Sequence, residues 1–152
     1  MVSEILLGGN QIYFYDLKTK ESFYQIDAYG EFFIIENQKI EWDYSKETKQ
    51  IGDYVCHKAT TMYRVENAKG VFNHNVTAWY ATEIPINVGP RGYHGLPGLI
   101  LELQEFKRNY VVSKIELNPE EKINIIKPKK GKRMTQKEFD ELGKTICFSR
   151  KQ

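Results

Sequence analysis

Residues 39–45 alternate between apolar and polar positions, with Ile40, Trp42 and Tyr44 on one face of the predicted strand. A period of two is what a half-buried antiparallel strand requires. Other segments rich in aromatic and β-branched residues favour strands as well. These further predicted strands cover residues 11–17, 22–28, 31–36, 53–65, 71–81, 99–106, 110–117 and 122–126.

Short polar or glycine-containing segments separate these strands. We expect turns at residues 18–21, at Tyr29-Gly30 and at Asn37-Gln38. The segment Asn67-Ala68-Lys69-Gly70 offers a further turn in which Gly70 takes a positive φ. It predicts a long hairpin between the two strands that flank it.

The end of the chain carries a helix signal. Thr135-Gln136-Lys137-Glu138 fits a capping box, and Phe139, Leu142 and Ile146 follow at helical spacing. Consecutive strands followed by one helix argue against alternating β-α-β units. We therefore predict a mainly β fold, a curved antiparallel sheet or half-barrel with a short C-terminal α-helix, as a single domain over residues 1–152.

Residues 84–98 break the strand pattern, because glycine and proline recur throughout them. We expect an ordered loop. Leu96-Pro97-Gly98-Leu99 suits a type II turn, with Pro97 fixing its own φ and Gly98 taking a positive φ. Gly95 would then permit a close backbone approach. This loop either only redirects the chain or forms the mouth of a binding cleft.

Composition narrows the class of partner. The 152 residues include 22 Lys+Arg and 20 Asp+Glu, and this net charge of +2 argues against a nucleic-acid partner. No apolar run reaches the length of about 18–20 residues that a transmembrane segment needs. Residues 127–133 hold five cations. They form either a patch for an anionic partner or a solvated loop before the helix.

Two cysteines, Cys56 and Cys147, lie far apart in the sequence. This spacing indicates neither a zinc site nor a disulfide framework. Two alternatives stay open. The thiols pack independently as small apolar groups, or a Cys56–Cys147 disulfide ties the C-terminal segment to the sheet.

Candidate catalytic and metal-binding groups are few. His57 and His74 fall on the two arms of the predicted hairpin, where they could face each other and hold a metal with Glu83; His94 lies in the loop. However, the sequence has no HxH or HExxH spacing, so ordinary surface or half-buried histidines are favoured. It also lacks a nucleophile elbow, a P-loop and a dinucleotide fingerprint. We expect no enzymatic activity, no metal and no cofactor.

Several elements in order carry a family resemblance. Tyr54-Val55-Cys56-His57-Lys58-Ala59 is followed by Trp79-Tyr80, Ile84-Pro85, Gly89-Pro90 and then Gly95-Leu96-Pro97-Gly98-Leu99-Ile100. This series resembles the GLPGLI family over residues 35–142. The family occurs mainly in Bacteroidetes, has no established activity, and its members usually carry signal peptides. The resemblance implies export to the periplasm or the cell surface, although no signal peptide is visible at the start of this sequence.

Together these observations favour an exported, non-catalytic binding module of the cell envelope. An apolar concavity would hold a lipid, a hydrophobic small molecule or a peptide. The alternative is a partner-docking protein in outer-membrane transport or assembly, which would use residues 84–98 or 127–133. The candidate ligand or partner contacts are Trp79, Tyr80, Pro85, Pro90, Tyr93, Leu96 and Pro97.

Overall fold

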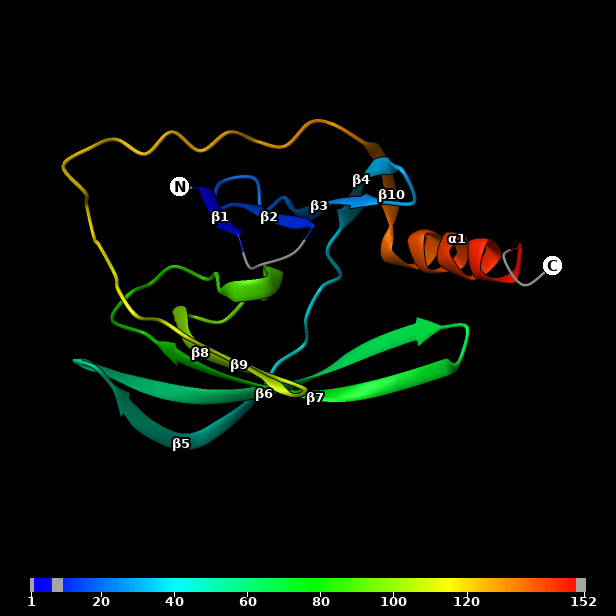
Figure 1. Ribbon diagram of the computed structural model, residues 1–152. Helices are drawn as coiled ribbons and strands as arrows, with labels where there is room; N and C mark the ends of the chain where they lie inside the picture. Colours follow the sequence, from blue (N-terminus) through cyan, green and yellow to red (C-terminus); the bar gives the residue numbers. More distant parts are fainter. Residues whose placement is uncertain (1, 7–9, 150–152) are drawn as a thin grey trace.

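The computed structural model describes residues 2–6 and 10–149, which form two five-stranded sheets stacked as layers (Figure 1). The first sheet has the order β1-β2-β3-β4-β10, and the second β5-β6-β7-β8-β9. Neighbouring strands are antiparallel except β10, which is parallel to β4. The predicted mainly β fold with a C-terminal helix is confirmed. The elements are β1 (Val2–Leu6), β2 (Gln11–Asp16), β3 (Ser22–Ala28), β4 (Glu31–Glu36), β5 (Asp43–Ile51), β6 (Tyr54–Asn67), β7 (Gly70–Ala81), the 3-10 turn η1 (Pro90–Gly92), β8 (Leu99–Glu105), β9 (Arg108–Val111), β10 (Lys132–Thr135) and α1 (Gln136–Ser149).

Two of the predicted turns, at residues 18–21 and at Tyr29-Gly30, are confirmed, whereas Asn37-Gln38 forms no turn and begins the crossover to the second sheet. Between β2 and β3, the Asp16 carboxylate accepts the backbone N–H groups of Lys18 at 2.8 Å and Thr19 at 3.3 Å. Between β3 and β4, Tyr29 and Gly30 both have positive φ, at 54° and 80°. Two such residues make the type I′ turn, whose twist matches that of the strands on either side.

Residues 113–131, which we call the strap, begin on the second sheet, where Ile115 packs against the cluster that includes Leu101, and then cover the outer face of the first sheet. The strap runs from the end of the second sheet around one side and over the first sheet to β10 (Figure 1). The Gln25 side chain on β3 donates a hydrogen bond to the Lys130 carbonyl at 2.6 Å. The Lys127 ammonium lies 5.8 Å from the centre of the Phe14 ring. The strap therefore shields an aromatic sheet face.

The strand predicted at residues 122–126 is wrong, and the one at 110–117 is too long, because β9 ends at Val111. Ile123 and Ile126 of the predicted strand are 72% and 75% exposed. Their β propensity needs a neighbouring strand edge to take effect. The strap crosses the sheet face instead of pairing along an edge.

Helix α1 covers part of the inner face of the first sheet. Phe139 and Leu142 pack against a buried cluster that includes Tyr24 and Phe33. The Thr135 hydroxyl accepts the Glu138 backbone N–H at 3.2 Å, which confirms the predicted N-cap. Among the residues described, no helix is long and apolar enough to cross a membrane.

The second sheet is built on the predicted hairpin. Asn67 pairs with Gly70, whose φ is 129°, and the register then continues to Cys56 opposite Ala81. Ala59, Val76, Ala78 and Leu103 form the buried centre of this sheet's inner face. The long hairpin is confirmed.

Residues 37–42 cross from the first sheet to the second. They divide the strands between two sheets, whereas the pattern alone predicted one curved sheet. The strand expected at 39–45 starts only at Asp43, and Tyr44 is 61% exposed. Trp42 lies outside the strand and packs against the loop, where its indole N–H donates to the His94 carbonyl at 2.8 Å. The alternation reflects packing against the loop rather than a strand.

Two glycines in the loop exchange their predicted roles. Gly95 takes the positive φ, at 94°, whereas Gly98 does not, so the predicted type II turn is wrong. A Cβ atom at Gly98 would lie 2.2 Å from the Ala81 carbonyl oxygen, while one at Gly95 would meet nothing closer than 3.8 Å. Gly98 is therefore the position that allows β8 to approach the end of β7 closely.

Candidate functional site

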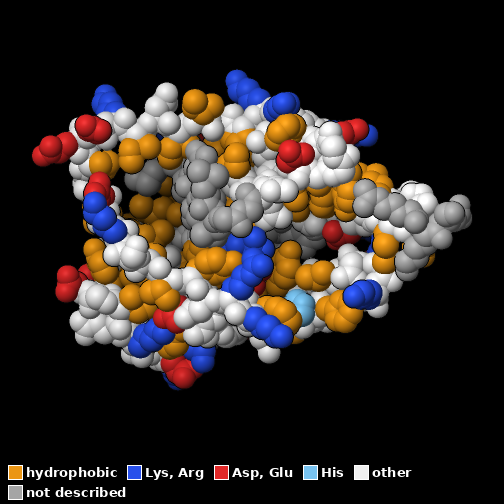
Figure 2. Space-filling view, viewed as in Figure 1, with side chains coloured by type: hydrophobic (Ala, Val, Ile, Leu, Met, Phe, Trp, Pro, Cys, Tyr) orange, Lys and Arg blue, Asp and Glu red, His pale blue; other side chains and the backbone are white. Residues whose placement is uncertain are grey.

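A cleft of about 510 Å³ lies between the inner faces of the two sheets. Figure 2 shows the hollow between the two layers, with hydrophobic side chains on its walls. Its lining side chains come from segments far apart in the sequence. They include Gln11, Tyr13 and Tyr24 on the first sheet, Thr61, Tyr63, Arg64 and Glu105 on the second, Arg91 and Tyr93 on the loop, and Gln136 on α1.

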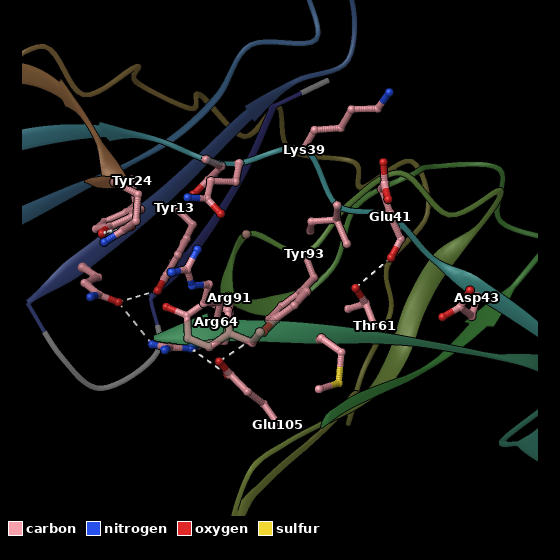
Figure 3. Close-up of a pocket in the computed structure, with 18 residues that line it drawn as sticks. Tyr13, Tyr24, Lys39, Glu41, Asp43, Thr61, Arg64, Arg91, Tyr93 and Glu105 are labelled. Carbon is pink, nitrogen blue, oxygen red and sulfur yellow. Dashed lines mark hydrogen bonds and ion pairs between the residues drawn. The ribbon is translucent and has the colours of Figure 1, made fainter. Parts of the chain in front are cut away.

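Arg91 lies at the centre of the cleft (Figure 3). Its Nε donates to Glu105 Oε2 at 3.2 Å, and its Nη1 donates to Gln11 Oε1 at 3.1 Å. The side chains of Arg91 and Glu105 are only 21% and 9% exposed. Because Gln11 belongs to the first sheet and Glu105 to the second, the guanidinium joins the two layers.

The backbone at Arg91 is unusual. Arg91 has a φ of 61° and Gly92 a φ of 76°. A left-handed conformation costs free energy at a residue other than glycine, and such residues cluster at ligand sites. The turn that begins at Pro90 directs the arginine into the cleft.

Three buried tyrosines in the cleft lining act as hydrogen-bond donors. Tyr93 Oη donates to Glu105 Oε1 at 3.2 Å, and Tyr24 Oη donates to Gln136 Oε1 at 2.7 Å. Tyr13 donates to Gln11. Burial raises the pKa of Tyr13 to about 12, and it also raises the pKa of Tyr24 and of Tyr93. All three hydroxyls therefore stay protonated at neutral pH.

Tyr63 differs from the other tyrosines because 39% of it is exposed. Its ring centre lies 6.5 Å from that of Tyr93. Among the residues that the structure describes, its hydroxyl has no hydrogen-bond partner. Tyr63 thus offers the cleft an aromatic surface that a ligand can contact.

A polar recess continues the cleft toward α1. Its volume is about 400 Å³, and it shares Gln38 and Arg64 with the main cleft. Lys144 on α1 forms an ion pair with Glu66 on β6 at 2.6 Å, which ties the helix to the hairpin beside this recess. The shared lining makes one long depression of the two.

Of the candidate contacts predicted from sequence, Tyr93 lines the cleft. Trp79 lies on the opposite face of the second sheet, where the Lys49 ammonium is 4.5 Å from its ring centre. Tyr80 and Leu96 are buried in the core of the second sheet, with Leu96 only 1% exposed. The loop therefore supplies mostly structural side chains.

The three predicted prolines also lie outside the cleft lining. Pro85 and Pro97 are exposed on the loop, and Pro90 begins η1. Each proline ring fixes the φ of its own residue in the loop. Pro90 also begins the turn that carries Arg91, so it helps to position that side chain.

The histidines are dispersed. His57 pairs with Tyr80 and His74 with Tyr63, so the two histidines do not face each other as the hairpin suggested. The His74 ring contacts Phe106, and His94 Nδ1 is 2.9 Å from the Gly92 carbonyl. Within the described part of the chain, no group of three His, Cys, Asp or Glu side chains is placed to hold a metal ion.

Both cysteines are free thiols. Cys56 is fully buried with Ala81 and Leu101 on the outer side of the second sheet, whereas Cys147 lies half-buried on α1. Burial raises the pKa of the Cys56 thiol. Of the two alternatives, independent thiols hold in this structure and the Cys56–Cys147 disulfide does not.

The basic segment at 127–133 belongs to the strap and β10. Lys127 and Arg133 pair with Glu21 at 2.5 and 2.7 Å. Their hydrogen bonds hold the pKa of Glu21 below its usual value. Part of this positive charge is therefore used to attach the strap to the first sheet.

Sequence reasoning did not identify Arg91, Glu105 and Tyr63 as site residues. Arg91 had one signal, its position in Gly-Pro-Arg-Gly, where a charged side chain follows a rigid residue. Glu105 and Tyr63 lie on ordinary strands. Only the stacking of the two sheets brings these groups to one place.

Comparison with known proteins yields one family. A family model described as a protein of unknown function (Porph_ging) matches residues 66–102, which include β7, the loop and the first part of β8. No curated protein and no solved structure matches the chain. The matched segment contains Arg91 and Tyr93, but it covers less than half of the chain.

Proposed function

We propose that this chain is a non-catalytic binding module whose ligand occupies the cleft between the two sheets. The observation that carries the proposal is the position of the Arg91 guanidinium at the centre of an open cleft, where hydrogen bonds to Gln11 of the first sheet and Glu105 of the second hold it in place. Ligand sites are concave, largely preformed and equipped with a few fixed polar groups. This cleft has all three properties.

The hydrogen bonds around Glu105 support binding rather than proton transfer. One carboxylate oxygen accepts from Arg91 and the other from Tyr93. A general base needs a lone pair aimed at the substrate, and both carboxylate oxygens of Glu105 are turned toward protein donors. Glu105 serves as a structural acceptor that orients two donors.

The lining favours a ligand with polar groups. Aromatic rings alternate in it with amides, guanidinium groups and carboxylates. Several of these groups bond one another. The Gln38 amide and Arg91 Nη2 have no partner among the described residues, so a hydrocarbon chain would leave them without hydrogen bonds, at about 1–3 kcal/mol for each group. Among lipids, hydrophobic small molecules and peptides, the lining therefore supports a lipid least.

We also propose that the chain is a GLPGLI-type envelope protein, on the motif Gly95-Leu96-Pro97-Gly98-Leu99-Ile100. This part of the proposal rests on the resemblance and implies a periplasmic or surface location. Fractionation of cells that produce the natural protein tests it. Recovery from the cytoplasmic fraction alone would contradict it.

The binding proposal is tested by native mass spectrometry after incubation with a cell extract of compounds below about 3 kDa, a range that includes the drug-sized ligands such clefts enclose. We expect an additional non-covalent mass on the protein. Gln38→Trp narrows the cleft, because Gln38 lines both of its parts. Gln50→Trp is the matched control, because Gln50 is exposed on β5 and lies outside the cleft lining.

The additional mass should disappear in Gln38→Trp and persist in Gln50→Trp. Binding that is equal in both variants would place the ligand elsewhere and refute the cleft. A bare mass in the unmodified protein would refute a small-molecule module.

A further inference from the structure

The charged side chains that line the cleft balance one another. Three are cationic and three are anionic, which leaves no net formal charge in the cleft. A phosphate, an anionic headgroup or a strongly charged peptide would therefore gain no general attraction there. The cations are Lys39, Arg64 and Arg91, and the anions are Glu41, Asp43 and Glu105.

Neutral hydrogen-bonding groups surround these charges. The cleft is also lined by four side-chain amides, which combine a donor and an acceptor in one planar group. Arg91 adds N–H groups, since its Nη2 has no partner among the residues that the structure describes. The carbonyl oxygens of Gln11 and Gln136 already accept hydrogen bonds inside the protein, so the groups left for a ligand are chiefly the amides of Asn37 and Gln38 and the Nη2 of Arg91. These remaining donors and acceptors suit a ligand whose hydroxyl groups both donate and accept. The amides are Gln11, Asn37, Gln38 and Gln136.

The exposed ring of Tyr63 supplies the apolar part of the site. It stands beside Tyr93, with ring centres 6.5 Å apart, on the wall opposite Tyr13 and Tyr24. The C–H face of a sugar ring is apolar and packs flat on an aromatic ring, while its equatorial hydroxyls point sideways. Aromatic surface bordered by amides and by a guanidinium matches both parts of such a ring.

The backbone of the walls argues against an extended peptide. A peptide that adds to a sheet needs an unpaired strand edge. The wall strands β3 and β6 are each paired on both sides, β3 with β2 and β4, and β6 with β5 and β7. The cleft lies between sheet faces and presents side chains, not a row of backbone groups.

We infer that the cleft binds a neutral carbohydrate, with a sugar ring on Tyr63 and its hydroxyls on Arg91 Nη2 and the amides of Asn37 and Gln38. This inference rests on the proposed binding function and names its ligand class. It gives a role to Arg91, Tyr63 and the cleft amides, which belong neither to the Gly95–Ile100 motif nor to the histidines.

The test uses the full chain on an array of neutral oligosaccharides, which includes gluco-, manno-, xylo- and galacto-hexaoses and chitohexaose. Acidic oligosaccharides and uncharged hexapeptides are present on the same array. Isothermal titration then gives the affinity of the best probe. We expect a neutral oligosaccharide to bind with a Kd below about 1 mM.

Variants locate the bound sugar. Tyr63→Ala should weaken binding by about tenfold or more, and Tyr63→Phe should recover most of that loss, because the ring is retained. Tyr44→Ala is the control, since Tyr44 is 61% exposed and lies outside the cleft lining. Gln38→Trp, at an exposed position, gives a second test if Tyr63→Ala fails to fold.

Absence of any neutral oligosaccharide bound below about 1 mM would overturn the inference. So would affinity that neither Tyr63→Ala nor Gln38→Trp reduces. Binding of only acidic probes or only peptides would also overturn it. If the array is blank while native mass spectra still show a mass that Gln38→Trp removes, the carbohydrate is wrong and the binding module stands. If neither experiment shows a ligand, both are wrong.

Discussion

The two sheets bury their strands differently, although both contain five strands among the residues described. In the first sheet, runs of three consecutive residues are buried, such as Tyr13-Phe14-Tyr15 and Phe33-Ile34-Ile35. The second sheet has such a run at residues 100–103 on β8, but the far part of its hairpin stays open, with Met62 58% and Val71 49% exposed. Consecutive buried residues require cover on both faces of a sheet, because neighbouring side chains point to opposite sides.

The cover of the first sheet comes from sequence-distant segments. The strap lies on its outer face, and α1 lies on part of its inner face. The second sheet has no such double cover over its far hairpin, so this region owes less of its stability to tertiary burial. The cleft between them therefore has one wall that is covered from behind and one that ends in an open hairpin.

The largest expected effect comes from a substitution in the core of the first sheet, which is covered on both faces. Phe23 is 0% exposed and stacks on Phe14 with ring centres 4.9 Å apart. We expect Phe23→Ala to lower the free energy of unfolding by about 3–5 kcal/mol, measured by urea denaturation. Phe106→Ala removes the same side chain where it is 65% exposed, and should cost less than about 1 kcal/mol. Equal losses in the free energy of unfolding for the two variants would mean that burial of the first sheet on both faces does not stabilise the protein more than an exposed position does.

The next effect tests the tight joint between the loop and the second sheet. In Gly98→Ala, the new methyl group meets the Ala81 carbonyl oxygen at 2.2 Å, so the backbone must move. The expected loss is about 2–3 kcal/mol in the free energy of unfolding. Gly95→Ala strains only the positive φ and should cost about 1 kcal/mol. A larger loss for Gly95→Ala than for Gly98→Ala would instead support the sequence prediction, in which Gly98 takes the positive φ and Gly95 makes the close backbone approach.

An alkaline titration examines the tyrosine wall of the first sheet. Burial raises the pKa of Tyr13 from 10.0 to about 12, so the folded protein keeps a proton that the unfolded chain loses. The stabilising contribution is complete below pH 10.0 and is lost as the pH rises toward about 12. We expect Tyr13→Phe to remove on the order of 1–2 kcal/mol of this alkaline loss, measured by urea denaturation at several pH values. Identical pH dependence in both proteins would contradict burial of this hydroxyl.

The smallest effect concerns how the strap is attached. Glu21→Gln weakens the contacts with Lys127 and Arg133, and should cost below about 1 kcal/mol because these groups are partly solvated. The difference should fade in about 1 M salt. Glu116→Gln is the control, since Glu116 pairs with Lys114 inside the strap. A larger loss for Glu21→Gln than for Phe23→Ala would show that charge, and not aromatic burial, holds the strap.

Much of the local structure was predictable from particular residues. Aromatic and β-branched segments indicated strands, Tyr29-Gly30 and Gly70 indicated turns, and Thr135 indicated the helix start. These signals act between neighbours in the chain, where turn geometry and capping are decided. The strand predicted at residues 122–126, within the strap, is wrong. Strand propensity indicates what a segment can form beside a suitable strand edge, but not whether such an edge is present.

The sequence by itself determined the mainly β class, the long hairpin and the C-terminal helix, because each depends on local backbone preferences and on the period of apolar positions. Only the tertiary structure decided that the strands divide into two layers, that Gly98 and Gly95 exchange roles, and that Arg91 meets Gln11 and Glu105. Those outcomes depend on which distant surfaces pack together. The candidate site exists only because that packing turns two sheet faces toward each other.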